Sequence, residues 1–270
     1  MRSSASLDAF SGLGAWVSIY DTRAWNDPEG TVATLADNGV HTLYLESANY
    51  KQRVDLVKPT VVARFLTAAH ASGISVVGWY LPSLANPKRD LRRALAGARL
   101  LTADGDTFDA FALDVEATVV RRLGLRNARA ASLTAAVRRA LGPTYPLGAI
   151  TIAPVGAAPT YWPNYPFKTL AQNVDVLLPM EYFTARVRGA ARVGTYVQAN
   201  IDAIRSAIGD DAFPIHAIGG SSPKATGAEV AAFVSAAMSE STIGASLWEY
   251  GAMTNAEWTQ IEPASALTAG

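Results

Sequence analysis

The chain has 270 residues, of which 50% are hydrophobic, and this size suits one α/β barrel of about 250 residues. It contains no cysteine, which excludes disulfide bonds and thiolate metal sites. Lysine plus arginine equals aspartate plus glutamate, so a nucleic-acid partner is not indicated. No apolar run approaches the ~20 residues of a membrane-spanning helix.

Short apolar segments alternate with amphipathic segments along the chain. The apolar segments are rich in Val, Ile, Leu and aromatic residues, a composition typical of buried parallel strands. The expected strands are Gly14–Asp21, Thr42–Ser47, Ser75–Pro82, Ala110–Glu116, Leu147–Pro154, Val174–Phe183, Pro214–Gly220 and Ala245–Tyr250.

Helices are expected between these strands, several with a proline or asparagine at the start and a glycine after the end. They are Pro59–Ser72, Pro87–Ala103, Asn127–Leu141 with Asn127 as its cap, Gly194–Ile208, Lys224–Met238 and Thr254–Ile261. Residues 155–167 are rich in proline and aromatic residues and predict a long loop, with at most a short helix after it.

Eight alternating β and α units predict a single (β/α)8 barrel, the TIM barrel of the α/β class, rather than an open six-stranded sheet. We expect residues 1–13 to form an N-terminal extension, residues 14–262 to form the barrel, and residues 263–270 to form a disordered tail.

Reactive groups of such barrels lie at the C-terminal ends of the strands. Strand ends that merely emerge into water would carry lysine and threonine as readily as carboxylates. No lysine lies on an expected strand, which argues against a Schiff-base aldolase. Carboxylates and aromatic residues concentrate at these ends: Asp21, Glu46, Trp79, Tyr80, Asp114, Glu116, Glu181, Tyr182, Trp248, Glu249 and Tyr250.

The fourth expected strand is the most informative. Strand alternation places Ala110, Ala112, Asp114 and Glu116 on one face, and apolar residues on the other. Small residues with terminal carboxylates suit the barrel lumen. Two carboxyls this close repel each other as anions, and the more buried one is kept protonated near neutral pH. Cleavage of a glycosidic bond requires one protonated acid and one anion, so the pair indicates this chemistry.

Residues 108–116, Phe-Asp-Ala-Phe-Ala-Leu-Asp-Val-Glu, resemble the fourth-strand signature Asp-Gly-x-Asp-x-Asp-x-Glu of family 18 glycoside hydrolases, the chitinases and their relatives. Asp109, Asp114 and Glu116 match this signature, whereas Ala110 replaces its glycine and Ala112 its middle aspartate.

Two other strands resemble the same family. Met180-Glu181-Tyr182 is similar to its Met-x-Tyr-Asp motif, with Phe183 in place of the acid, and Trp248 lies where a sugar-floor tryptophan is expected.

The chain is also similar to family 25 lysozymes. Leu113-Asp114-Val115-Glu116 resembles their Asp-x-Glu strand, and Leu247-Trp248-Glu249-Tyr250 resembles their closing Trp-Gln-Tyr strand. Val77-Gly78-Trp79-Tyr80 resembles Gly-x-Tyr-His, with Leu81 instead of histidine. Together the resemblances span most of the expected barrel.

Both resemblances imply that Glu116 is the general acid. The chitinase resemblance implies that Asp114 orients the 2-acetamido group of the substrate, which is then the nucleophile, and that Tyr182 helps to hold it. The lysozyme resemblance implies a second carboxylate across the cleft, Asp21 or Glu181. Glu181 alternates with Tyr182 and reaches the lumen only if the strand has already turned into its loop.

Aromatic faces at the rim suit sugar rings. We expect Tyr161 and Trp162, in the proline-rich loop, to contact substrate, whereas Trp16 and Trp258 are interpreted as structural. The three histidines are not spaced as metal ligands, and His216 is interpreted as a hydrogen-bonded core residue.

The sequence therefore predicts a glycoside hydrolase that acts on an amino-sugar glycan of the peptidoglycan or chitin type. The alternatives are a carbohydrate-binding barrel without turnover and, with weaker support, a phosphosugar enzyme that uses Gly219-Gly220. We expect an oligo- or polysaccharide partner, no cofactor, metal, nucleic acid or membrane, and a monomer. Such a substrate favours secretion, with a leader absent from this numbering.

Overall fold

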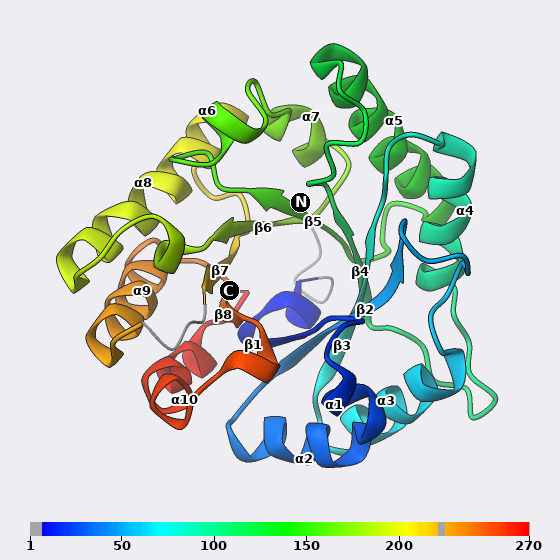
Figure 1. Cartoon of the computed structure of the whole chain (residues 1–270), viewed down its shortest axis with the longest axis horizontal. Helices are drawn as coiled ribbons and strands as arrows, with labels where there is room; N and C mark the ends of the chain where they lie inside the picture. The colour runs from blue at the N-terminus through cyan, green and yellow to red at the C-terminus, as the bar shows by residue number, and fades with distance from the viewer. Residues whose placement is uncertain (1–6, 221–224, 270) are drawn as a thin grey trace.

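The computed structural model describes residues 7–220 and 225–269, which form one closed barrel of parallel strands in the order β1 to β8 (Figure 1). Each strand pairs with the next in sequence, and β1 pairs with β8. This confirms the predicted (β/α)8 barrel. The strands are β1 Gly12–Val17, β2 Thr42–Asn49, β3 Ser75–Leu81, β4 Ala110–Asp114, β5 Leu147–Ile152, β6 Val176–Glu181, β7 His216–Gly220 and β8 Gly244–Trp248.

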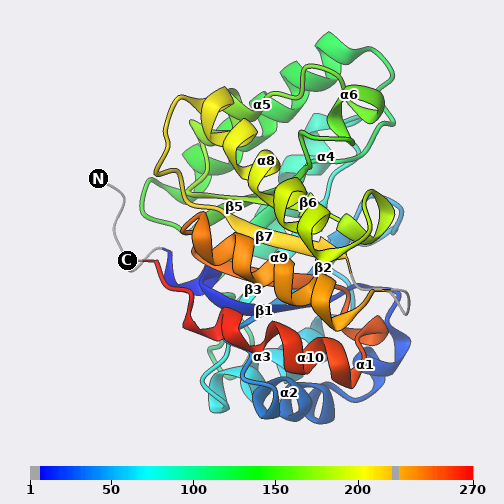
Figure 2. The same ribbon diagram turned by 90° about the vertical axis from the view of Figure 1, so that its left-hand side faces the viewer.

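Helices surround the barrel, and Figure 2 shows α8, α9 and α10 side by side across its outside. None of the helices within the described ranges is both long and apolar enough to cross a membrane. The helices are α1 Thr22–Asn26, α2 Pro28–Asp37, α3 Pro59–Ala71, α4 Pro87–Ala98, α5 Leu123–Leu141, α6 Ala158–Tyr161, α7 Phe167–Ala171, α8 Ala190–Ile208, α9 Gly227–Ser239 and α10 Asn255–Ile261.

The connection between β1 and β2 differs from the prediction. The first strand ends at Val17, and two helices that were not expected, α1 and α2, follow it. Asp21 is not a strand residue but the N-cap of α1, because its Oδ1 accepts a hydrogen bond of 3.1 Å from the amide of Ala24. Asp27 caps α2 in the same way, through the amide of Gly30 at 3.1 Å.

The fifth helix and the proline-rich loop also differ from the prediction. α5 begins at Leu123, so Asn127 lies inside the helix and does not cap it. The Asn127 side chain instead accepts a hydrogen bond of 2.6 Å from the indole N–H of Trp162 and donates one of 2.8 Å to the carbonyl of Asn164. Residues 155–167 contain the four-residue helix α6, which proline punctuation alone did not indicate.

The two predicted terminal segments are part of the barrel where the structure describes them. The 3-10 helix η2 (Asp8–Phe10) buries Phe10 completely at the N-terminal end of the lumen. A second, η5 (Glu262–Ala266), contacts β1 and β8 and buries Ala264. Phe10 packs among the lumen residues and Ala264 packs in the layer between the sheet and the helices, so burial of apolar surface holds both segments in place.

The lower lumen is a fully satisfied hydrogen-bonded layer. His216 Nδ1 lies 2.8 Å from the carbonyl oxygen of Phe10 and 3.1 Å from the hydroxyl of Tyr44, and Nε2 lies 2.9 Å from Ser246 Oγ. Gly244 leaves room for the imidazole, because a Cβ atom there would overlap the ring. His216 is thus the hydrogen-bonded core residue that the sequence predicted.

Candidate active site

A cavity of about 250 Å³ opens at the C-terminal ends of the strands, directly above this layer. Its walls come from residues far apart in the sequence, as the barrel topology requires. The lining residues are Trp16, Ser18, Tyr20, Glu46, Asn49, Lys51, Trp79, Leu81, Asp114, Glu116, Ile150, Met180, Tyr182, Ile218 and Trp248.

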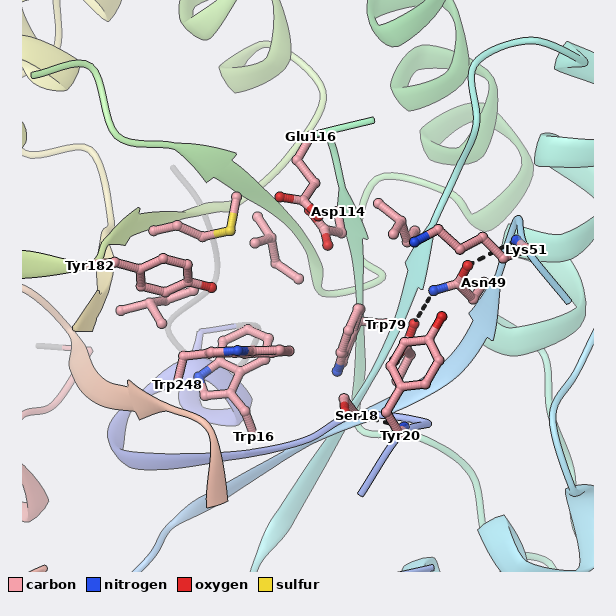
Figure 3. Close-up of a pocket in the computed structure, with 15 residues that line it drawn as sticks. Trp16, Ser18, Tyr20, Asn49, Lys51, Trp79, Asp114, Glu116, Tyr182 and Trp248 are labelled. Atoms are coloured by element: carbon pink, nitrogen blue, oxygen red, sulfur yellow. Dashed lines mark hydrogen bonds between the residues drawn. The ribbon is translucent and has the colours of Figure 1, made fainter. Parts of the chain in front are cut away.

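The carboxylate pair of the fourth strand lies on the cavity wall. Asp114 is the last residue of β4, and Glu116 follows at the rim (Figure 3). Ala112 packs inside the lumen, whereas Leu113 and Val115 pack against the helices, as strand alternation predicted. One buried strand therefore aims both carboxyls into the same space.

Burial governs the protonation of this pair. Removal from water, followed by repulsion from Glu116 and Glu46, raises the pKa of Asp114 well above its usual range. Burial also raises the pKa of Glu116, and the nearby Lys51 ammonium opposes this. Since both carboxyls favour the protonated state, the pair holds a proton to a higher pH than free carboxyls do, and this proton serves a general acid when it is on Glu116.

Glu46 supplies a third carboxyl, from β2. Its Oε2 accepts a hydrogen bond of 2.8 Å from the amide of Ile19, and its Oε1 accepts one of 2.7 Å from the amide side chain of Asn49. Burial outweighs both bonds and raises the pKa of Glu46 to about 7. The β2 strand has an irregular register between Glu46 and Ala48, which lies just before Asn49 in the sequence.

Buried Arg93, on α4, fixes the loop that carries Lys51. Its guanidinium donates hydrogen bonds of 2.8 Å to the carbonyl of Asn49 and 2.6 Å to the carbonyl of Gln52. The backbone N–H of Lys51 in turn donates to Asn49 Oδ1 at 2.9 Å. Lys51 is therefore held beside Glu116 by an ordered loop.

Three tryptophans form the aromatic wall of the cavity. The ring centroids of Trp16, Trp79 and Trp248 lie 5.9 to 6.0 Å from one another, and Tyr182 lies 6.5 Å from Trp248. Figure 3 shows Trp16 and Trp248 across the cavity from Asp114, with Tyr182 beside them. Such flat faces suit the apolar faces of sugar rings.

Two buried polar atoms of the lining have no hydrogen-bond partner among the described residues. They are the indole N–H of Trp79 and Oδ1 of Asp114. Desolvation, followed by repulsion from Asp114 and Glu116, raises the pKa of Tyr182, so its hydroxyl stays protonated and is able to donate. The cavity thus presents two donors and an acceptor to a ligand.

Three residues predicted to contact substrate do not reach the cavity. The Tyr80 hydroxyl donates to Asp90 at 2.6 Å in the layer between sheet and helices. Trp162 is completely buried against α5. Glu181 is buried on the opposite face of β6 from Tyr182, near Tyr196 of α8, so it is not the second carboxylate of a cleft. Burial raises its pKa well above the usual range.

The remaining predicted residues lie around the cavity rather than in its lining. Asp21 is committed to its cap, and Tyr250 packs on Trp258 with ring centroids 6.5 Å apart. Glu249 lies close enough to raise the pKa of Glu46. Tyr161 is 48% exposed and lines two neighbouring grooves that also include Glu116.

Several lining residues were missed or misjudged from the sequence. Trp16 was interpreted as structural, and it does stack on Tyr44 with centroids 4.1 Å apart, but it also lines the cavity. Alternation from Gly14 through Trp16 to Ser18 was the available signal. Asn49 and Lys51 follow a strand expected to end at Ser47, so no pattern indicated them.

No metal site is apparent in the described ranges, and the glycines of the phosphosugar alternative leave little space around them. No group of three or more histidine or acidic side chains there is placed to hold a metal ion. Gly219 and Gly220 are closely packed, and a Cβ atom at Gly220 would overlap the Thr184 hydroxyl. The serines that follow them lie outside the described residues.

Comparison with known proteins locates the fold but not the family. No protein-family model matches the chain, and neither does any curated protein. The endo-β-1,4-mannanase from Thermotoga petrophila is similar in structure with a TM-score of 0.72 and 10% identity, over 98% of this chain and 78% of the mannanase.

Two further solved structures are similar to this chain over most of its length. The Bacillus cereus spore cortex-lytic enzyme SleL has a TM-score of 0.69 and 10% identity, over 93% of this chain and 73% of SleL. A family 18 chitinase from Cycas revoluta, solved with (GlcNAc)4, has a TM-score of 0.69 and 9% identity, over 94% of this chain and 99% of the chitinase. The chain thus has a glycoside hydrolase-like (β/α)8 barrel fold.

Proposed function

We propose that this protein is a glycoside hydrolase that cleaves a glycan containing N-acetylhexosamine, with Glu116 as the general acid. The observation that carries the proposal is one cavity that combines Asp114 and Glu116 with a wall of three tryptophans. A protonated acid beside an aromatic sugar platform is what glycosidic cleavage needs.

The lining favours a nucleophile supplied by the substrate. Asp21 caps a helix and Glu181 faces the helix layer, so neither lines the cavity. Glu46 does line it, but both of its oxygens already accept hydrogen bonds, from the amide of Ile19 and the side chain of Asn49. Asp114 is adjacent to the acid and deeper in the lumen, where it suits the N–H of a 2-acetamido group. The Tyr182 hydroxyl suits the acetamido oxygen.

The proposed reaction has two steps. Glu116 donates its proton to the glycosidic oxygen while the acetamido oxygen attacks the anomeric carbon, and the bond to the leaving sugar breaks. The resulting oxazolinium cation is stabilised by Asp114 through the acetamido N–H. The Glu116 carboxylate then removes a proton from water, which attacks the anomeric carbon and restores the acetamido group.

The test is reducing-sugar release from chitin oligomers, peptidoglycan and neutral glycans by the wild type and by Glu116→Gln. We expect release from an N-acetylhexosamine glycan and a loss of about 10²-fold or more in the variant. The exposed carboxylate variant Glu262→Gln is the matched control and should retain the wild-type rate. An equal rate for Glu116→Gln would contradict the assignment.

A carbohydrate-binding barrel without turnover is the second candidate. It is favoured by Ala112, which packs among apolar lumen residues where the family 18 signature has an aspartate, and by Phe183, which packs on Phe233. Neither residue supplies a carboxylate that would influence the charge of Asp114. Binding of an oligosaccharide without any release of reducing sugar would establish this candidate instead.

A further inference from the structure

A hollow lined by three arginines lies beside the cavity, between β6 and α8. Arg186, Arg188 and Arg192 border it together with Thr184, Ala185 and Val187, and its volume is about 330 Å³. Among the residues that the structure describes, no carboxylate lines this hollow. In a chain with no net formal charge, it is a local concentration of positive charge.

The arginine hollow is continuous with the candidate active site. A groove of about 180 Å³ has Glu116 and Tyr182 at one end, where Figure 3 shows them, and Ala185 and Arg186 at the other. Ala185 and Arg186 border both the groove and the arginine hollow. A chain bound at Glu116 and extended past Tyr161 would therefore reach the guanidinium groups.

Two of the arginines, Arg186 and Arg192, are available for a ligand, and their segment is fixed. Arg186 and Arg192 are exposed, and neither is ion-paired with a carboxylate within the described ranges. Arg188 lies near Glu229, whose carboxylate accepts a hydrogen bond of 2.7 Å from the amide of Gly189. The Nε of Arg192 donates to the carbonyl of Arg188 at 2.6 Å.

The two ends of this path differ in their charged side chains. Three carboxyls and Lys51 line the cavity, whereas the hollow beyond the groove is lined by arginines. An uncharged glycan gains little from a cationic hollow. A glycan with carboxylate substituents is attracted to it, and planar guanidinium groups match carboxylates in geometry.

We propose that the substrate of this cleft is an anionic glycan whose carboxylate binds to Arg186 and Arg192. The inference rests on the proposed function and names the substrate class for the same site. The carboxylate belongs either to a lactyl ether on the sugar, as in peptidoglycan strands, or to a uronic acid within the chain.

Calorimetric binding to Glu116→Gln, which prevents turnover, tests the proposal with three probes that all contain N-acetylglucosamine. They are the neutral chitin hexamer, peptide-free peptidoglycan strands with lactyl carboxylates, and hyaluronan oligosaccharides with uronic carboxylates. We expect one anionic probe to bind more tightly than the neutral hexamer, and the preferred probe identifies the source of the carboxylate.

In the Glu116→Gln protein, the added substitutions Arg186→Ala and Arg192→Ala should lower the affinity for the anionic probe by about tenfold. The affinity for the neutral hexamer should change by less than about twofold. High salt should likewise lower the affinity for the anionic probe and leave that for the neutral hexamer nearly unchanged. Arg139→Ala, at an exposed position of α5, removes an arginine elsewhere and should have no effect.

Equal weakening of neutral and anionic probes would overturn the proposal, because it would assign the arginines a purely structural role. Binding of the neutral hexamer with no anionic preference would overturn it while leaving the proposed function intact. Binding of none of the three probes would overturn the proposed function and this inference together.

Discussion

The lower and upper halves of the lumen are built by the same strands but differ in whether their buried polar groups have hydrogen-bond partners. In the lower half, His216 is bonded to Phe10, Tyr44 and Ser246, and both ring nitrogens are satisfied. In the upper half, Asp114 Oδ1 and the Trp79 indole N–H are buried without partners in the described structure.

This difference separates the part of the lumen that stabilises the fold from the part that serves a ligand. A buried polar group without a partner costs roughly 1–3 kcal/mol, so the upper half is built at the expense of stability. Substitutions in the lower half should therefore reduce stability and leave activity per folded molecule intact. Substitutions in the upper half should reduce activity and leave stability unchanged or increased.

Asp114→Asn is expected to have the largest effect on activity. When the proton that the pair holds is on Glu116, Asp114 carries the negative charge that stabilises the oxazolinium cation. An amide cannot carry this charge, so kcat should fall by about 10²-fold or more. Urea unfolding should show unchanged or greater stability, because the variant removes a buried ionisable group. A loss of stability of more than about 2 kcal/mol would place Asp114 with the lower half instead.

His216→Ala should give the opposite result. The change removes the hydrogen bonds of His216 to Phe10, Tyr44 and Ser246 and opens a cavity, which should cost roughly 2–4 kcal/mol in urea unfolding. The KM of the folded fraction should stay at the wild-type value. A raised KM without loss of stability would mean that the lower layer takes part in binding.

The two halves should also respond to pH in opposite directions. The pKa of His216 is lowered from 6.5 to about 4, so its contribution to stability is present above pH 6.5 and is lost as the pH falls through about 4. The pKa of Glu46 is raised from 4.5 to about 7, so its contribution is present below pH 4.5 and is lost as the pH rises through about 7.

Each effect corresponds to roughly 3 kcal/mol. The wild type becomes less stable as the pH rises from 4.5 to 7, because Glu46 has to ionise while buried. Glu46→Gln avoids this loss, so its stability relative to the wild type should increase over the same range. His216→Ala should be less stable than the wild type at pH 6.5. This difference in the free energy of unfolding should shrink as the pH falls to 4, because the wild type then loses the contribution of His216. Urea unfolding at several pH values measures both, and parallel profiles for all three proteins would contradict the two assignments.

Trp248→Ala is expected to have the smallest effect. Loss of one stacking face should raise KM by about tenfold, equivalent to roughly 1.4 kcal/mol, without abolishing turnover. Trp258→Phe is the matched control, since Trp258 packs against Tyr250 outside the cavity lining. An equal rise in KM for both variants would show that the aromatic wall is not a specific sugar platform.

The fold could be predicted from the sequence because the burial of each strand and helix determines its local composition. The alternation of apolar and amphipathic segments is therefore visible in the sequence. The pair Asp114 and Glu116 followed for the same reason, since strand alternation fixes the face of each residue in β4. The two short helices after β1 did not follow, because Asp21 and Asp27 act as caps through backbone amides that a periodicity search ignores.

Side chains whose direction depends on tertiary contacts were the ones misplaced. Tyr80 and Trp162 are aromatic residues near the rim, but Asp90 and Asn127 bind their polar atoms in the helix layer. Lys51 enters the site because Arg93, on a different helix, orders its loop. Such long-range hydrogen bonds have no signature in a single sequence.

The most direct test of the upper lumen as an amino-sugar site is calorimetric titration of Glu116→Gln with two neutral tetrasaccharides, (GlcNAc)4 and its glucose counterpart without acetamido groups. If Asp114 and Tyr182 hold the acetamido group, (GlcNAc)4 should bind at least about tenfold more tightly, and Asp114→Ala should remove that preference. Equal affinity for the two sugars, or binding of neither, would contradict an amino-sugar site.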